Sequence, residues 1–322
     1  MKILSKLLSI IALCFVYVSI AHSQTYPAKP IKLIVPFPPG GTADILGRLL
    51  GDKLATVTSQ TVIVENRAGA AGGIAAASVA TSAPDGYTLL LGTTGTQTMN
   101  PAINSKLTYD SIKDFAGVSN FAASPFVLVV NPKIQAQNVE ELIALAKKEP
   151  GTLRYASFGT GSSAHMTGEM FKLRAGINIV HVPYKGAGPA LIDLVGGHVD
   201  MMFTLAPSVV QYLSSGSLRA LAVASSQRDL AIPDVPTFTQ AGLNDFISDS
   251  WYGVFAPYGT PQPIIKKLNA DIQTILAMPD VQKRLAALGA MPVGNTPEQF
   301  DEQVKKGLVH WTKIAKEAKI SD

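Results

Sequence analysis

The sequence predicts an α/β protein in which helices cover both faces of a largely parallel sheet. Short apolar runs rich in β-branched residues alternate with helix-like segments along most of the 322 residues. The predicted strands are apolar throughout, which is typical of strands buried on both faces. A hydrophobic content of 47% supports a large core, and the length suits about two domains.

The first α/β unit begins after residue 30. Its expected elements are strand 31–37, helix 42–55, strand 61–65, helix 73–81 and strand 87–91. A long extended segment at 115–130 then interrupts the alternation.

A second alternation follows that segment. Helix 139–148 has Asn138 as its expected N-cap and Glu141 three residues later, which is the pattern of a capping box. The further elements expected in this unit are strand 153–158, helix 163–174, strand 177–182, helix 189–195, strand 199–204, helix 207–213 and strand 218–224. A second α/β domain is the simplest explanation of this order.

A second extended segment, 246–257, is followed only by helices. These helices are expected at 262–278, 281–288 and 297–318. Because they have almost no strands of their own, they must pack on an existing sheet, most simply the first one. The two extended segments are then the crossings between domains, and we expect the first domain at 24–124 with 251–322 and the second at 125–250.

Residues 1–23 are expected to be a secretory signal peptide. Lys2 and Lys6 precede an apolar run of 14 residues that closes with small residues, and cleavage is expected near Ser23. The run is shorter than the roughly 20 residues of a membrane-spanning helix, so a retained anchor is the less favoured alternative. Cys14, the only cysteine, lies within the run. Thiol catalysis by the processed chain is therefore excluded.

The charge of the processed chain is nearly balanced. Removal of the leader leaves 25 basic residues against 23 acidic ones. A balance this weak and this dispersed argues against a nucleic acid or a membrane surface as the partner.

Three loops share one design, because each follows an expected strand and opens an expected helix. They read P-F-P-P-G-G-T at 36–42, G-T-T-G-T-Q at 92–97 and S-F-G-T-G-S-S at 157–163. Such junctions lie at the carboxyl ends of parallel strands, where ligands bind, and the helix N-termini there favour an anion. The loops therefore predict a backbone cradle for a carboxylate or a similar small anion. Ordinary turn and capping chemistry is the alternative interpretation.

Catalytic and cofactor signatures are scarce. The third loop fits the dinucleotide fingerprint G-x-G-x-x-G/A, but the next strand, I-N-I-V-H-V-P-Y, has no acid to hold a ribose. The sequence contains no Walker loop, no G-x-S-x-G, no H-E-x-x-H and no C-x-x-C. We expect no catalytic residue, no cofactor and no metal site. Among the scattered histidines only His165 is placed to face a cleft.

The block H-V-P-Y-K-G-A-G-P-A-L-I-D-L-V-G-G-H-V-D, at 181–200, makes a family resemblance specific. The chain resembles the Bug family, the TctC-like extracytoplasmic solute receptors of tripartite tricarboxylate transporters. The supporting motifs are P-F-P-P-G-G-T-A-D (36–44), V-E-N-R-A-G-A-A-G-G (64–73), P-D-G-Y-T-L-L-L-G (84–92) and W-Y-G-V-F-A-P-Y-G-T-P (251–261). They span essentially the whole chain after the leader.

The resemblance implies a periplasmic-binding-protein fold of type II, with two doubly wound α/β lobes joined by two extended crossing segments. It implies a periplasmic, monomeric binding protein without enzyme activity. The two lobes would close around one small carboxylate, which could be an organic acid, an amino acid or an aromatic acid. The partners implied are that ligand and the membrane components of a tripartite tricarboxylate-type transporter.

The resemblance and the loops together give a set of expected ligand contacts. These are Phe37, Pro38, Gly40, Gly41, Thr93, Thr94, Thr160, Ser162, Ser163, His165, Tyr184, Asp200 and Thr204. Asp200 ends the segment G-G-H-V-D, which we place at the carboxyl end of a strand. There it would meet the variable end of the ligand, or else cap a helix or brace the hinge.

Two other functions are open at this point. A sensory receptor would use the same cleft and present its closed form to a membrane signalling protein. An exported enzyme would use His165 and Asp200 as acid and base, and the lack of a paired catalytic constellation counts against it.

Overall fold

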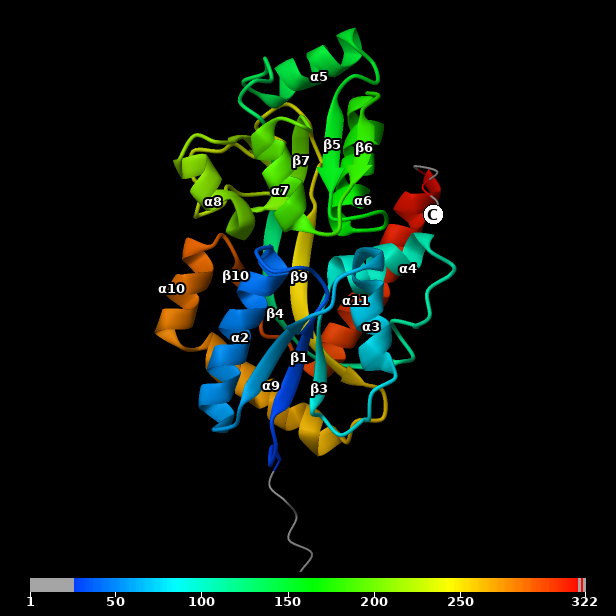
Figure 1. The fold of residues 1–322 in the computed structure, drawn as a ribbon, viewed down its shortest axis with the longest axis vertical. Coiled ribbons are helices and arrows are strands. Elements are labelled where there is room, and N and C mark those ends of the chain that lie inside the picture. Colours follow the sequence, from blue (N-terminus) through cyan, green and yellow to red (C-terminus); the bar gives the residue numbers. More distant parts are fainter. Residues whose placement is uncertain (1–25, 318–319, 321–322) are drawn as a thin grey trace, which may run out of the picture.

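The structure, a computed structural model, describes residues 26–317 and residue 320; the expected signal peptide lies outside these residues. Two α/β lobes are stacked along the long axis of the molecule (Figure 1). Two long strands, β4 (Phe115–Val130) and β9 (Asp249–Pro257), run between the lobes and pair with each other in antiparallel fashion. They correspond to the two extended segments expected from the sequence.

The first lobe has the sheet order β2-β1-β3-β9-β4. The three N-terminal strands are parallel, namely β1 (Ile31–Val35), β2 (Val62–Asn66) and β3 (Thr88–Thr93). The crossing strand β9 is antiparallel to β3, and β10 (Met291–Pro292) is antiparallel to β4. The sheet is therefore mixed rather than parallel throughout, because the two crossing strands enter and leave the lobe in opposite directions.

Helices cover both faces of this sheet. Along β1, Ile31, Leu33 and Val35 share one buried cluster with α2, whereas Ile34 joins a second cluster on the opposite face. That alternation follows from the two-residue period of a strand. The helical elements of the lobe are α2 (Thr42–Thr58), η2 (Ala70–Gly72), α3 (Gly73–Ala80), η3 (Gly95–Met99), α4 (Asn100–Ile103), α9 (Gln262–Leu276), α10 (Pro279–Ala287) and α11 (Pro297–Glu317).

The second lobe is built on the other half of β4. This strand pairs with β9 as far as Pro125 and with β7 (Met201–Leu205) and β8 (Arg219–Val223) from Phe126 onward. Beyond β7 lie β5 (Arg154–Ser157) and β6 (Val180–Pro183), which are parallel to it and to each other. The change of partner lies beside the lobe boundary that we propose at 124/125.

The helices of the second lobe include α5 (Val139–Lys148), whose N-cap is Asn138 as predicted, whereas Glu141 reaches back to the residue before the cap. Asn138 Oδ1 accepts the Glu141 N–H at 2.9 Å, and Glu141 Oε2 accepts the Gln137 N–H at 2.7 Å. The others are α6 (Ser163–Ala175), α7 (Ala187–Gly196) and α8 (Ala206–Ser214). Across residues 26–317, no helix combines the length and the apolar character needed to cross a membrane.

Candidate functional site

Two neighbouring cavities between the lobes share the side chains of Phe37 and Phe158 as walls. The first, here called the inner cavity, leaves about 20 Å³ open to the centre of a water-sized sphere. That is room for about one water molecule. Its lining residues come from both lobes and are Phe37, Gly41, Thr42, Ala43, Thr93, Phe158, Ser163, Ala187, Ser250 and Tyr252.

The inner cavity is polar without being charged. None of its lining residues is ionised at neutral pH, yet five of them carry hydroxyl groups. Three helices begin at its wall, since Thr42, Ser163 and Ala187 are the first residues of α2, α6 and α7. The N-terminus of a helix presents unpaired N–H groups and a partial positive charge. The cavity therefore offers neutral hydrogen-bond donors and helix dipoles to an anion.

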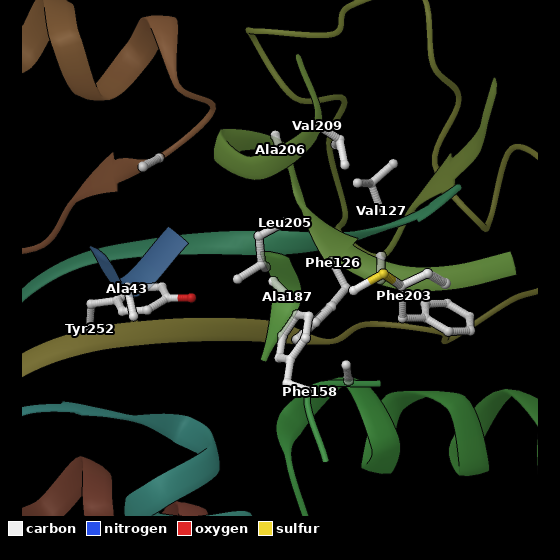
Figure 2. Packing of buried hydrophobic residues seen from close by; sticks show 14 of the residues in the cluster. Ala43, Phe126, Val127, Phe158, Ala187, Phe203, Leu205, Ala206, Val209 and Tyr252 are labelled. Carbon is white, nitrogen blue, oxygen red and sulfur yellow. The ribbon is translucent and has the colours of Figure 1, made fainter. Parts of the chain in front are cut away.

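Ser250 and Tyr252 bring the crossing strand β9 into this site. Ser250 Oγ is buried and has no hydrogen-bond partner among residues 26–317. Burial raises the pKa of the Tyr252 phenol, so this hydroxyl stays protonated at neutral pH. In Figure 2 the Tyr252 hydroxyl points toward the side on which the second-lobe residues Leu205 and Ala187 lie. The Tyr252 hydroxyl also lies near the hydroxyls of Ser250 and Thr42, so the three form one polar group at the cavity wall.

The lobes touch at the mouth of the inner cavity. Thr42 Oγ1 of the first lobe lies 2.7 Å from Ser208 Oγ of the second. A Cβ placed on Gly41 would lie 3.3 Å from Ala187 Cβ, which leaves almost no space between the two loops. The two lobes are therefore in direct contact at this point.

The second cavity, here called the outer cavity, is much larger, at about 310 Å³ by the same measure. It is separated from the inner one by the rings of Phe37 and Phe158, whose centroids are 6.2 Å apart in an edge arrangement. Its other lining residues are Gly69, Ala70, Ala71, Gly72, Asn104, Gly159, Thr160, Tyr184 and Lys185. Lys185 is its single charged residue, and no carboxylate of the described chain lies within 4.0 Å of the ammonium group.

The structure gathers several of the expected ligand contacts at these cavities. Phe37, Gly41, Thr93 and Ser163 line the inner cavity. Phe37, Thr160 and Tyr184 line the outer one. Their contact with a ligand remains a prediction.

Other expected contacts have structural partners of their own. Thr94 Oγ1 accepts the Trp251 N–H at 2.9 Å, and Ser162 Oγ caps α6 by accepting the His165 N–H at 3.4 Å. Thr204 is fully buried and lines neither cavity, although its Oγ1 has no hydrogen-bond partner among the described residues. Pro38 and Gly40 do not line either cavity. We leave these five residues out of the proposed contact set.

Asp200 does not lie at the carboxyl end of a strand, so that expectation was wrong. It precedes β7, and its Oδ2 accepts the backbone N–H of Arg154, the first residue of β5, at 2.6 Å. Because β5 and β7 are parallel, this amino-terminal edge is opposite to the one that carries the cleft loops. The segment G-G-H-V-D is the turn that ends α7 and leads into the next strand, rather than the end of a strand.

His165 also differs from its expected place. It is only 7% exposed, lines neither cavity, and accepts the Gly161 N–H at Nδ1 from a distance of 3.1 Å. Its ring therefore supports the loop from below instead of facing the cleft.

Six lining residues of the inner cavity were not among the expected contacts, namely Thr42, Ala43, Phe158, Ala187, Ser250 and Tyr252, and most of the outer lining, including Lys185, was not expected either. Phe158 and Ala187 belong to the quoted loop motifs, so the signal was present but these residues were not chosen. Lys185 stands in H-V-P-Y-K-G and could have been found in the same way. Ser250 and Tyr252 lie within the crossing strand β9, which has no turn chemistry to mark them.

Comparison with known proteins decides the family. The sequence model of the tripartite tricarboxylate transporter family receptor, TctC, matches residues 46–320. The chain belongs to the TctC receptor family. It is similar to the protein BugT of Bordetella pertussis, with 39% identity over 318 residues that cover 98% of each chain.

Solved structures of similar proteins have the same fold as this TctC receptor. One described as a periplasmic transporter has 43% identity and a TM-score of 0.89, and the match covers 92% of this chain and 99% of that one. A protein of R. palustris with adipate has 35% identity and a TM-score of 0.90, with the same coverage. The fold is thus a mixed α/β periplasmic-binding-protein fold, and the family is one of transporter binding proteins rather than enzymes.

Proposed function

We propose that this receptor captures a small carboxylate between its two lobes in the periplasm and delivers it to the membrane components of a tripartite tricarboxylate-type transporter. Closure of the lobes around the ligand would be the signal that the membrane components recognise. A leader-like N-terminus and a similar protein described as a periplasmic transporter support the location.

The observation that carries this proposal is the chemistry of the inner cavity. It combines five hydroxyl groups with three helix N-termini and has no charged side chain. Neutral donors and helix dipoles stabilise a single negative charge without an opposing cation. Because the donors come from both lobes, a bound carboxylate would hold the lobes together.

The outer cavity favours an acid with a second negative group. The inner cavity is too small for more than one end of a ligand, so the remaining part would extend past Phe37 and Phe158. There the ammonium of Lys185 would meet a second carboxylate. A dicarboxylate such as adipate suits this arrangement, and adipate accompanies the similar R. palustris protein.

Titration calorimetry with adipate, adipamide and hexanoate tests the proposal. Adipate has both carboxylates, hexanoate has one, and adipamide has the same length with none. We expect adipate to bind most tightly, hexanoate more weakly, and adipamide without measurable heat. Equal binding of adipate and adipamide would show that the inner cavity does not recognise a carboxylate.

A substitution at Lys185 separates the two ends of the ligand. In Lys185→Met we expect the Kd for adipate to rise roughly three- to tenfold, because an exposed charge pair contributes modestly, while hexanoate binding stays unchanged. Lys133→Met is the matched control, since Lys133 lies at the far end of the second lobe, near Gly197. If the two substitutions change the Kd for adipate equally, or if Lys185→Met leaves it unchanged, Lys185 does not contact the ligand.

A further inference from the structure

Two histidine rings are stacked beneath the loop at 157–163. His165 lies in the first turn of α6 and His181 on β6, and their ring centroids are 4.1 Å apart with an interplanar angle of 18°. The His181 ring also stacks on the ring of Tyr155 in β5, and the centroids of these two rings are 4.9 Å apart. The stack is thus packed between the loop and the sheet of the second lobe.

Hydrogen bonds connect both rings to the loop. The Gly161 N–H donates to His165 Nδ1 at 3.1 Å. The Gly159 N–H donates to Ser157 Oγ at 3.1 Å, and that oxygen lies 2.6 Å from His181 Nε2. Each ring therefore fixes one glycine of the loop, directly or through Ser157.

The loop needs such support because its backbone is unusual. Gly159 has φ of +124° and Gly161 has φ of +79°, which are conformations that few other residues adopt. Gly161 also lies against the first lobe, because a Cβ placed on it would come within 2.7 Å of Asn100 Oδ1. The next residues after Gly161 are Ser162, the cap of α6, and Ser163, which lines the inner cavity.

We propose that His165 is a positioning residue for ligand binding, which holds the loop at 157–163 in its binding shape by accepting the Gly161 N–H at Nδ1. This inference rests on the proposed carboxylate function, since the loop carries Ser163 to the inner cavity. His181 supports the same loop through Ser157.

The role requires a neutral His165 ring. Once Nδ1 is protonated it cannot accept a hydrogen bond, and its N–H would oppose that of Gly161. The titratable groups packed around the ring are His181, Tyr155, Glu169 and Lys172. Glu169 Oε1 accepts hydrogen bonds from the Tyr155 hydroxyl at 2.6 Å and from Lys172 Nζ at 2.9 Å. The negative charge of Glu169 favours protonation of His165, but the desolvation of the buried ring outweighs it and lowers the pKa of His165.

The direction of the pH effect follows from burial. Desolvation lowers the pKa of His165, and it lowers the pKa of His181 to about 4. Both rings are therefore neutral at pH 7. Below the ordinary histidine pKa, these histidines bind protons in the unfolded chain but remain neutral in the folded one. Their contribution to the free energy of folding is therefore fully present above that pH, and it is lost as the pH falls through the lower pKa values of the folded chain. The affinity for the ligand should therefore also decrease as the pH falls.

Two substitutions at His165 test the role. In His165→Asn the side-chain carbonyl can replace Nδ1 as acceptor, whereas His165→Leu has no acceptor. With adipate as the probe at pH 7.5, we expect the leucine variant to bind roughly tenfold more weakly and the asparagine variant to bind within about threefold of the natural chain. The asparagine variant should also lose the part of the pH dependence that comes from His165. Leucine and asparagine variants with equal affinity would overturn the proposal.

A readout without ligand keeps this inference separate from the proposed function. Amide hydrogen exchange by NMR should show Gly161 protected in the natural chain and in His165→Asn, and exposed in His165→Leu. In the natural chain the Gly161 amide resonance should titrate together with the His165 ring, a result that requires no variant to fold. A Gly161 amide that is unaffected by His165 would refute the positioning role, whereas failure of adipate to bind with the expected exchange pattern would refute only the carboxylate proposal.

Discussion

Ser124 and Ser250 are register partners on the two crossing strands, and their hydroxyls have different surroundings. Ser124 Oγ donates to the Gly289 carbonyl at 2.9 Å, inside the protein. Ser250 Oγ has no partner among residues 26–317 and lines the inner cavity. An unpaired buried hydroxyl is costly unless something else satisfies it, and a ligand carboxylate would do so.

The first prediction concerns this serine pair. In Ser250→Ala we expect adipate to bind about three- to tenfold more weakly, while the free energy of unfolding changes by less than about 0.5 kcal/mol. In the control Ser124→Ala we expect the reverse, with a loss of about 1 kcal/mol of stability and no change in adipate affinity. Calorimetric titration and urea unfolding measure the two quantities. The assignment of Ser250 to the ligand fails if its removal reduces stability and leaves affinity intact.

Asp200 provides a second prediction at the residue scale. Its carboxylate joins the starts of β5 and β7 by accepting the Arg154 N–H at 2.6 Å and by pairing with Arg154 Nε at 3.4 Å. In Asp200→Ala we expect a loss of about 1 kcal/mol in unfolding free energy and an unchanged Kd for adipate. A marked loss of affinity for adipate without a loss of unfolding free energy would show that Asp200 acts in ligand binding after all.

At the scale of elements, the loop before α2 and the loop before α7 determine how closely the lobes approach. Gly41 ends the first of these loops with an extended backbone, φ of −90°, so a side chain there is not strained by its own backbone. The space is limited only by Ala187 across the cleft, at 3.3 Å from a Cβ at this position. A larger residue at Gly41 should therefore act where the two lobes meet, at the wall of the inner cavity.

The third prediction uses that contact. In Gly41→Val we expect adipate affinity to fall by about tenfold or more, because overpacking at a tight contact costs about 1 to 3 kcal/mol. The unfolding temperature without ligand should change little. The double variant Gly41→Val with Ala187→Gly should recover part of the affinity, as a coupled pair does. Additive effects of the two substitutions would show that they do not meet in the closed state.

The order of elements could be predicted because each has a local signal. The capping box at Asn138 and Glu141 gave helix 139–148 with the bounds that the structure has. The start of the strand after α7 was harder to predict, because G-G-H-V contains both turn residues and strand residues. Its start is set by pairing with Tyr155 on β5 and Val130 on β4, which are distant in sequence. Asp200 was misplaced for this reason.

For the whole molecule, two apolar extended segments sufficed to predict two lobes joined by crossings, because a segment with no turn must run on from one sheet to the next. The inner cavity could be predicted only in part. Phe37, Gly41, Thr93 and Ser163 follow strands in loops with recognisable chemistry. Ser250 and Tyr252 line the inner cavity from within β9, where no turn or capping chemistry marks them in the sequence.

The central claim is that one carboxylate is held by both lobes together. Hydrogen exchange measured by mass spectrometry, with and without a saturating concentration of the tightest-binding acid of the calorimetric series, tests it most directly. We predict slower exchange in the loops at 36–44 and 157–163 together, with the same dependence on ligand concentration. Protection confined to one lobe, or absent from both, would contradict capture between the lobes.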